Sequence, residues 1–315
     1  MRMVSKVYGV VMLASSAVAL AEPLPVHSQA PLRSLLYSTA PITTDYQLGW
    51  QLASDIHAAS IFAVDPNYTL DYYQMEYGLE AFYGVSADWR WRAGARWLRS
   101  DDAHLDQLTL TFHNLFGLDQ NGRDLVPKHR FLVDVPEAGV RVEQFDGQSL
   151  VNKFYLGLDH RWWHADKHQL ASSITLQYND GGAPWRSGSR WDAGGQLDYG
   201  YRRSNGDQAW LMLGLSHSGA DQILGLPVRS LLAQIAAGYR HYLAPRHSIA
   251  LQYQLSRGAI EGLGQLAQLV HEIHFGYRYQ HRRQQWDLIL LENAENPDNS
   301  ADFGFAVRFA YRFNS

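Results

Sequence analysis

The sequence predicts an all-β protein, a transmembrane antiparallel β-barrel of about 12 strands with a short helix in one long loop. Three observations predict this fold. Apolar and polar residues alternate in segments of about ten residues, short and long connections alternate between these segments, and aromatic residues gather near the short connections.

The composition excludes several other classes of protein. The 315 residues include 27 Lys and Arg against 31 Asp and Glu, and the net charge of −4 excludes nucleic-acid binding through a basic surface. There is no Cys, which excludes disulfide scaffolds, thiolate metal sites and Cys nucleophiles. Hydrophobic residues reach 46%, so the chain is not disordered. Aromatic residues at 13% with a mean hydropathy of −0.30 are unusual for a soluble enzyme.

The first 21 residues form a predicted secretory signal peptide. Arg2 and Lys6 precede an uncharged run, 7–21, which ends in the small-x-small sequence Ala-Leu-Ala. The alternative, an N-terminal membrane anchor, needs roughly 20 apolar residues, and this run is shorter. We therefore expect export and cleavage after Ala21, with 22–45 as a periplasmic or lumenal segment and 46–315 as the barrel.

The alternation is clearest at 88–98, where Trp89 and Trp91 point to one face and Arg90 and Arg92 to the other. It is weakest at 284–292. The twelve predicted strands lie near 46–57, 70–83, 88–98, 151–163, 168–179, 190–203, 208–217, 230–242, 247–256, 267–280, 284–292 and 301–313.

The connections between these segments favour a membrane barrel over a soluble β-sandwich. Short connections are expected at 84–87, 164–167, 204–207, 243–246 and 281–283, and long ones at 58–69, 99–150, 180–189, 218–229, 257–266 and 293–300. Short periplasmic turns and long outer loops are typical of outer-membrane barrels. An even number of strands places both termini of the chain on the short-turn side. A sandwich explains the alternation but neither this pattern nor the aromatic residues near the short turns, which are Tyr83, Trp89, Trp162, Tyr201, Tyr239, Tyr279 and Phe313.

The predicted lumen is strongly charged but mixed in sign. Twelve tilted strands give a backbone radius of about 12 Å, so an empty lumen would be a narrow pore. Two interpretations stay open: an ion-paired interior that holds the wall together, or a polar pathway with a weakly anion-preferring arginine stripe. The lumen-lining candidates are Glu76, Glu80, Arg90, Arg92, Arg96, Asp159, Arg161, Asp192, Asp198, Arg202, Arg240, Glu272, Arg278 and Arg308.

The long segment 99–150 is the predicted gating loop, because loops of this length are usually functional or disordered. We expect an ordered plug or lid, with a simple surface excursion as the alternative. The residues that follow helical spacing and the glycine that would end the helix are Leu105, Leu108, Phe112, Leu115, Phe116 and Gly117.

Part of this segment also resembles a known family. The sequence Phe-His-Asn-Leu-Phe-Gly-Leu at 112–118 and Asn-Gly-Arg-Asp at 121–124 are similar to the signature of a family of bacterial outer-membrane proteins carried as a domain of unknown function. Residues 23–32 resemble the start of that family and 301–313 its closing strand. The resemblance implies a barrel in the outer membrane of a Gram-negative-type bacterium, and it implies no activity.

Three motifs suggest other chemistry and are weak. His271 and His274 are three residues apart, which on a strand sends them to opposite faces, so we expect no metal and no cofactor. His217 and Ser218 suggest a lipase-type pair, but neighbours on a strand also point apart. The acidic stretch 292–302 would suit either calcium or a solvated loop.

The function expected from these features is a passive or gated conduit for small polar solutes. The alternatives are a lipid-modifying enzyme of the phospholipase or lipid A deacylase type, and a sealed structural envelope protein. No catalytic residue is assigned. The expected partners are outer-membrane lipid and lipopolysaccharide, the barrel-assembly machinery during insertion and a small polar solute, with no nucleic acid.

Overall fold

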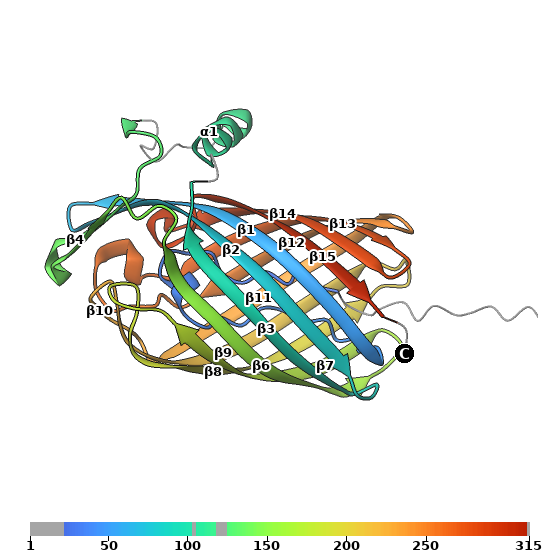
Figure 1. Cartoon of the computed structure of the whole chain (residues 1–315). Coiled ribbons are helices and arrows are strands. Elements are labelled where there is room, and N and C mark those ends of the chain that lie inside the picture. The colour runs from blue at the N-terminus through green and yellow to red at the C-terminus, as the bar shows by residue number, and fades with distance from the viewer. Residues whose placement is uncertain (1–21, 103–104, 118–124, 314–315) are drawn as a thin grey trace, which may run out of the picture.

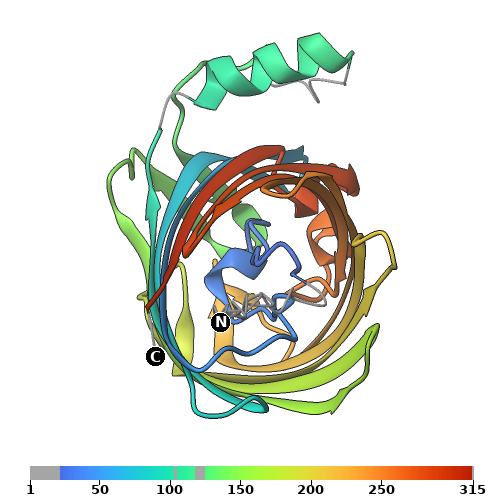
Figure 2. The ribbon, with the colours of Figure 1, turned by 90° about the vertical axis from the view of Figure 1, so that its right-hand side faces the viewer.

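The computed structural model describes residues 22–102, 105–117 and 125–313. The predicted signal peptide, 1–21, and the resemblance motif at 121–124 lie outside the described residues. Twelve long strands close into one antiparallel barrel (Figures 1 and 2), as the sequence predicts. They are β1 (Gly49–Asp65), β2 (Tyr68–Gly84), β3 (Trp89–Ser100), β6 (Ser149–His164), β7 (His168–Asp180), β8 (Ser187–Arg202), β9 (Gln208–Ile223), β11 (Leu231–Ala244), β12 (His247–Ser256), β13 (Val270–His281), β14 (Gln284–Glu295) and β15 (Phe303–Arg312).

The barrel closes between its first and last strands. β1 pairs with β2 on one side and with β15 on the other, for example Leu52 with Ala81 and with Tyr311. Each remaining barrel strand pairs with the barrel strands next to it in the sequence. A closed cylinder leaves no unpaired strand edge, which is what a hydrocarbon environment requires.

The smaller elements lie mostly at the end of the barrel with the long loops. They are α1 (Leu105–Phe116), β4 (Leu132–Val135), β5 (Val140–Glu143), β10 (Leu226–Pro227) and the 3-10 turns η1 (Arg33–Leu35), η3 (Pro136–Ala138), η4 (Gly264–Ala267) and η5 (Pro297–Asn299). None of the helices in the described residues combines the length and the hydropathy of a membrane-spanning helix.

One predicted long connection, 58–69, is wrong. β1 and β2 continue to Asp65 and from Tyr68, so a tight turn joins them. The extension is stable because its side chains are buried under the other outer loops: Ile61, Tyr72 and Tyr73 are each at most 1% exposed. The hairpin therefore forms part of the outer mouth.

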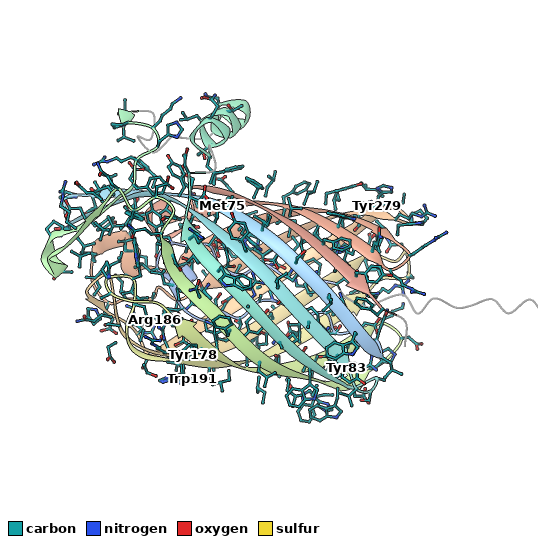
Figure 3. The ribbon with its side chains drawn as sticks, viewed as in Figure 1. Met75, Tyr83, Tyr178, Arg186, Trp191 and Tyr279 are labelled. Atoms are coloured by element: carbon teal, nitrogen blue, oxygen red, sulfur yellow. The ribbon has the colours of Figure 1, made fainter. Side chains whose placement is uncertain are left out.

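The two faces of the wall differ as a membrane barrel requires. Apolar side chains on the outside are exposed, including Ile174 and Leu288, while polar and charged residues next to them in the sequence, such as Ser173, Thr175 and Asp287, are buried. Figure 3 places Tyr83 and Tyr279 near the short-turn end and Tyr178 and Trp191 near the opposite rim. Aromatic residues thus flank the apolar band at both ends, which is the usual position of the membrane interfaces.

Candidate functional site

The lumen is filled by residues 22–45, which we call the plug. This segment enters from the short-turn end, turns at η1 near the outer loops and returns to the start of β1 (Figure 1), and it lies inside the ring of strands (Figure 2). None of its described residues is in a strand. Four prolines explain this, because proline has no amide hydrogen to give to a strand ladder; they are Pro23, Pro25, Pro31 and Pro41.

Carboxylates of the wall bind the amides that the plug cannot pair within itself. Glu272 accepts from the Gln29 amide at 2.9 Å, Asp192 from the Tyr37 amide at 3.0 Å and Asp198 from the Ile42 amide at 3.1 Å. A buried backbone amide without a partner is costly, so these contacts stabilise an irregular segment in the interior. Three of the predicted lumen-lining acids therefore hold the plug.

Side-chain amides of the wall bind the carbonyl groups of the plug in the same way. Gln234 donates to Thr39 at 2.7 Å, Gln196 to Ala40 at 2.9 Å and Gln74 to Gln29 at 2.9 Å. Together with the carboxylates, these residues come from four strands of the barrel: β2, β8, β11 and β13. The plug is held by many separate hydrogen bonds, and these do not form a continuous strand ladder.

The wall also has space shaped for the side chains of the plug. A Cβ atom at Gly194 would lie 2.3 Å from the Tyr37 ring, and one at Gly276 would lie 2.5 Å from Leu24. At Gly214 it would lie 2.2 Å from the Thr39 hydroxyl, and the three nearest atoms all belong to Thr39. These glycines allow the plug to approach the strands closely.

Replacing Gly214 with Leu should therefore displace the plug and leave the strand ladder intact. Overpacking of this kind costs about 1–3 kcal/mol. Arg33 is the only trypsin site in the plug and is fully buried, so we expect cleavage after Arg33 in Gly214→Leu and resistance in the parent protein. Gly195→Ala is the control, since its Cβ would make only an ordinary 3.5 Å contact. Equal resistance in both variants would contradict tight docking.

Many of the predicted lumen residues form ion pairs between strands on the inner face of the wall. Arg90 and Arg92 bind Asp159 at 2.6 and 3.0 Å, and Arg96 binds Asp55 at 2.8 Å and Glu76 at 3.0 Å. Arg161 and Arg202 are partly exposed at the short-turn end, and the rest are buried: Glu76, Glu80, Arg90, Arg92, Arg96, Asp159, Asp192, Asp198, Arg240, Glu272, Arg278 and Arg308.

The helix of the predicted gating loop, α1, does not enter the lumen. Figures 1 and 2 show α1 outside the ring of strands, so the expectation that 99–150 plugs the barrel is corrected: residues 22–45 occupy that space. The side chains of four predicted stripe residues, Leu108, Phe112, Leu115 and Phe116, are outside the described part. Leu105 is buried, and Gly117 follows the helix with a φ of +68°.

Flanking parts of 99–150 do help to cover the outer mouth. Phe131 and Phe145 pack with Trp185 and Leu224 of other outer loops. The tip of the plug joins the same apolar cluster through Leu32, Leu35 and Leu36. Apolar packing therefore covers the outer end of the barrel.

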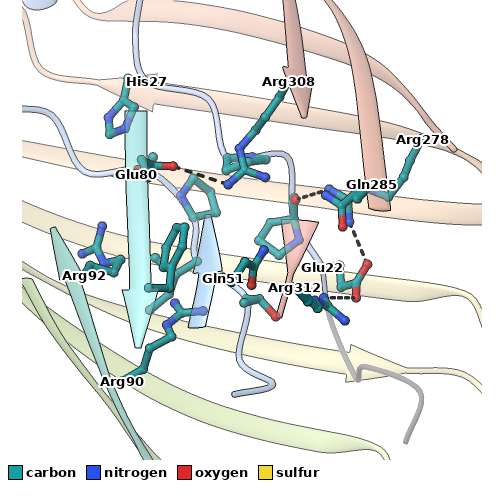
Figure 4. Close-up of a pocket in the computed structure, with 17 residues that line it drawn as sticks. Glu22, His27, Gln51, Glu80, Arg90, Arg92, Arg278, Gln285, Arg308 and Arg312 are labelled. Carbon is teal, nitrogen blue, oxygen red and sulfur yellow. Dashed lines mark hydrogen bonds and ion pairs between the residues drawn. The ribbon is translucent and has the colours of Figure 1, made fainter. Parts of the chain in front are cut away.

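At the short-turn end the interior is polar and keeps a cavity of about 70 Å³ between the plug and the wall (Figure 4). Glu22, the start of the plug, accepts a hydrogen bond from Arg278 at 2.8 Å and lies 3.6 Å from Arg312. Its carbonyl accepts from Arg240 at 3.1 Å, and its amide donates to Gln208 at 2.9 Å. Residue 22 is thus bound through every polar group.

The sequence contains two signals for the plug that a strand pattern does not use. One is the run of prolines between the predicted cleavage site and the first strand. The other is the poor alternation of β14, where Ile289 and Leu291 are buried and pack on Leu24 and Val26. Inward-facing apolar residues in a polar lumen indicate an apolar partner inside it.

The motifs for other chemistry are not assembled. His217 is exposed on the outer face and Ser218 is buried, where its hydroxyl donates to Asp192 at 3.1 Å, so the two do not form a pair. Among the residues that the structure describes, no group of three or more His, Cys, Asp or Glu is placed to hold a metal ion. In the acidic stretch 292–302, Asp298 accepts a hydrogen bond from Tyr68 at 2.7 Å.

Comparisons with known proteins give a family and a fold. A family model described as "Protein of unknown function (DUF3187)" matches residues 1–313. No curated protein matches the sequence. The NanC porin is 7% identical with a TM-score of 0.51, over 84% of this chain and 100% of that one. The KdgM porin is 6% identical, with a TM-score of 0.47 over 84% and 99%. The Pseudomonas putida toluene transporter TodX is 10% identical, with a TM-score of 0.43 over 93% and 100%.

Proposed function

Since the chain belongs to the DUF3187 family, whose function is unknown, we propose from its own geometry that it is an outer-membrane conduit for small polar solutes, closed at rest by residues 22–45. The observation that carries the proposal is a charged lumen whose contents are held without a strand ladder. Such a segment can withdraw toward the short-turn end without breaking the closed barrel. Outer-membrane lipid and lipopolysaccharide would cover the apolar outside.

The tip of the plug has a feature that favours undocking from the closed state. Arg33 is fully buried, and none of its three guanidinium nitrogens has a hydrogen-bond partner among the described residues. A buried charge without a direct partner costs several kcal/mol. This cost offsets part of the stabilisation from the wall contacts. The free energy that holds the plug in its docked position is therefore smaller than its burial alone suggests.

The second candidate is a sealed structural barrel. The glycines that fit Tyr37, Thr39 and Leu24 favour it, because they hold the plug closely. A lipid-modifying enzyme receives no such support, since His217 and Ser218 lie on opposite faces. The two candidates differ in one measurable property, which is whether the plug moves in the intact protein.

A reversible tether separates the two candidates. The chain has no Cys, and a Cβ at Gly214 would lie 2.9 Å from that of Thr39, so a small adjustment brings Thr39→Cys/Gly214→Cys to the 3.5–4.5 Å of a disulfide. In planar bilayers we expect voltage-driven openings of the parent protein and of the reduced double variant, with loss of the openings on oxidation of the double variant and their return on reduction; the parent is needed because a side chain at position 214 itself crowds residue 39. Each single variant is the control. An untethered protein that never opens would establish the sealed barrel instead.

A further inference from the structure

We infer that the cavity beside Glu22 is a binding site for one small anion, a carboxylate or a phosphate. It is formed by the wall and by two parts of the plug, 22–27 and 40–43, and its volume of about 70 Å³ exceeds the roughly 20 Å³ of the pocket beside it at the start of β1. The inference rests on the proposed function only in placing this anion on the path of a solute. Binding itself needs neither an open lumen nor a moving plug.

Charge is the first argument. Five guanidinium groups line the cavity, from Arg90, Arg92, Arg278, Arg308 and Arg312. Among the described residues, four carboxylates pair with them directly: Asp159 with Arg90 and Arg92, Asp287 with Arg278, Glu80 with Arg308, and Glu22 with Arg278 and Arg312. One positive charge is left over in a buried space, where an anion would balance it. If cleavage follows Ala21, the new amino group of Glu22 adds another.

A weakly engaged donor is the second argument. Arg308 is 6% exposed, and its Nη2 reaches the Glu80 carboxylate only at 3.4 Å, so this guanidinium is held loosely by its partner. Figure 4 shows Arg92 of β3 on one side of the cavity and Arg308 and Arg312 of β15 on the other. Planar guanidinium forks match the oxygens of a carboxylate or a phosphate.

Size is the third argument. A volume of roughly 10–15 Å³ is enough for one water molecule. The cavity of about 70 Å³ therefore admits an anion the size of acetate or phosphate, and it is too small for a sugar while the plug is docked. The ligand class is accordingly a small oxyanion.

The test uses the processed full-length barrel in detergent, titrated calorimetrically with sodium acetate and, separately, with sodium phosphate. Acetamide is the uncharged match for acetate. We expect saturable binding of one anion per barrel, no binding of acetamide and an affinity about tenfold lower in Arg308→Gln. Arg308→Lys should retain part of the affinity, because it keeps the charge. Arg190→Gln, at an exposed arginine on the outer rim, is the matched control and should bind as the parent does.

The two anions tell the sources apart: acetate alone points to a carboxylate solute, and phosphate alone to a phosphorylated one. Either result supports the site. Absence of saturable binding by both anions, or undiminished binding in a folded Arg308→Gln barrel, would overturn it. Failure of the conduit looks different. Anion binding without any opening in the tether experiment removes the conduit and leaves the site, and openings without anion binding do the reverse.

Discussion

Deletion of 22–45 should convert the barrel from rare openings to a steady ionic current in planar bilayers. The strand ladder that closes β1 on β15 begins at Gln51 and does not involve the plug, so the wall should still assemble. The polar groups that the plug satisfies, on Asp192, Asp198 and Glu272, would then face water and remain solvated. The loss of the apolar contacts of Leu32, Leu35 and Leu36 also loosens the packing at the outer mouth.

Deletion of 104–118 is the matched control for this experiment. It removes α1, which lies outside the ring of strands, and should leave the current close to that of the parent protein. A steady current from this deletion, with none from the deletion of 22–45, would show that the long loop 99–150 closes the barrel and the plug does not. The absence of current from both would mean that the outer loops alone seal the lumen.

Asp159→Ala should give the largest loss of stability among single substitutions in the wall. Asp159 is fully buried and receives hydrogen bonds from Arg90 and from Arg92. Its removal leaves two buried guanidinium groups without their carboxylate, and breaking a buried ion pair in this way costs about 3–5 kcal/mol. Unfolding in urea, followed by the fluorescence of the 10 Trp residues, measures the change.

The control for this substitution is Asp180→Ala. Asp180 pairs with Arg190 at 2.9 Å, but both side chains are about half exposed, and exposed pairs contribute about 0–1 kcal/mol. We therefore expect unfolding close to that of the parent protein. Similar losses in the two variants would show that Asp159 is hydrated or that other carboxylates replace it, and the ion-paired interior would then contribute little to the stability of the wall.

The wall was predictable because its signals are local. A residue on a strand points in or out according to its neighbours, so Trp89 and Arg90 can be assigned to opposite faces from the sequence alone. The alternation also holds in β14, but there the inward positions include the apolar Ile289 and Leu291, so polarity does not mark the inner face. Their position is favourable only because Leu24 and Val26 reach them from a distant part of the chain. A period-two pattern contains no information about such a partner.

The helix in 99–150 was also predictable from local spacing, but the surface on which it packs was not. Its spacing predicted a helix, and a helix is present at Leu105–Phe116. The sequence did not determine where that helix packs, because an apolar stripe fits a lumen, a mouth or a lipid surface equally well.

By itself, the sequence determined the barrel, its twelve strands and the charged inner face, since these follow from alternation and from the need to pair every backbone group in lipid. Only the tertiary structure decided what fills the barrel. The plug is an irregular chain whose amides and carbonyls are bound by single side chains such as Asp192 and Gln234, which lie far from it in the sequence. Contacts of that kind have no period, and they exist only after the cylinder has closed around the segment that it holds.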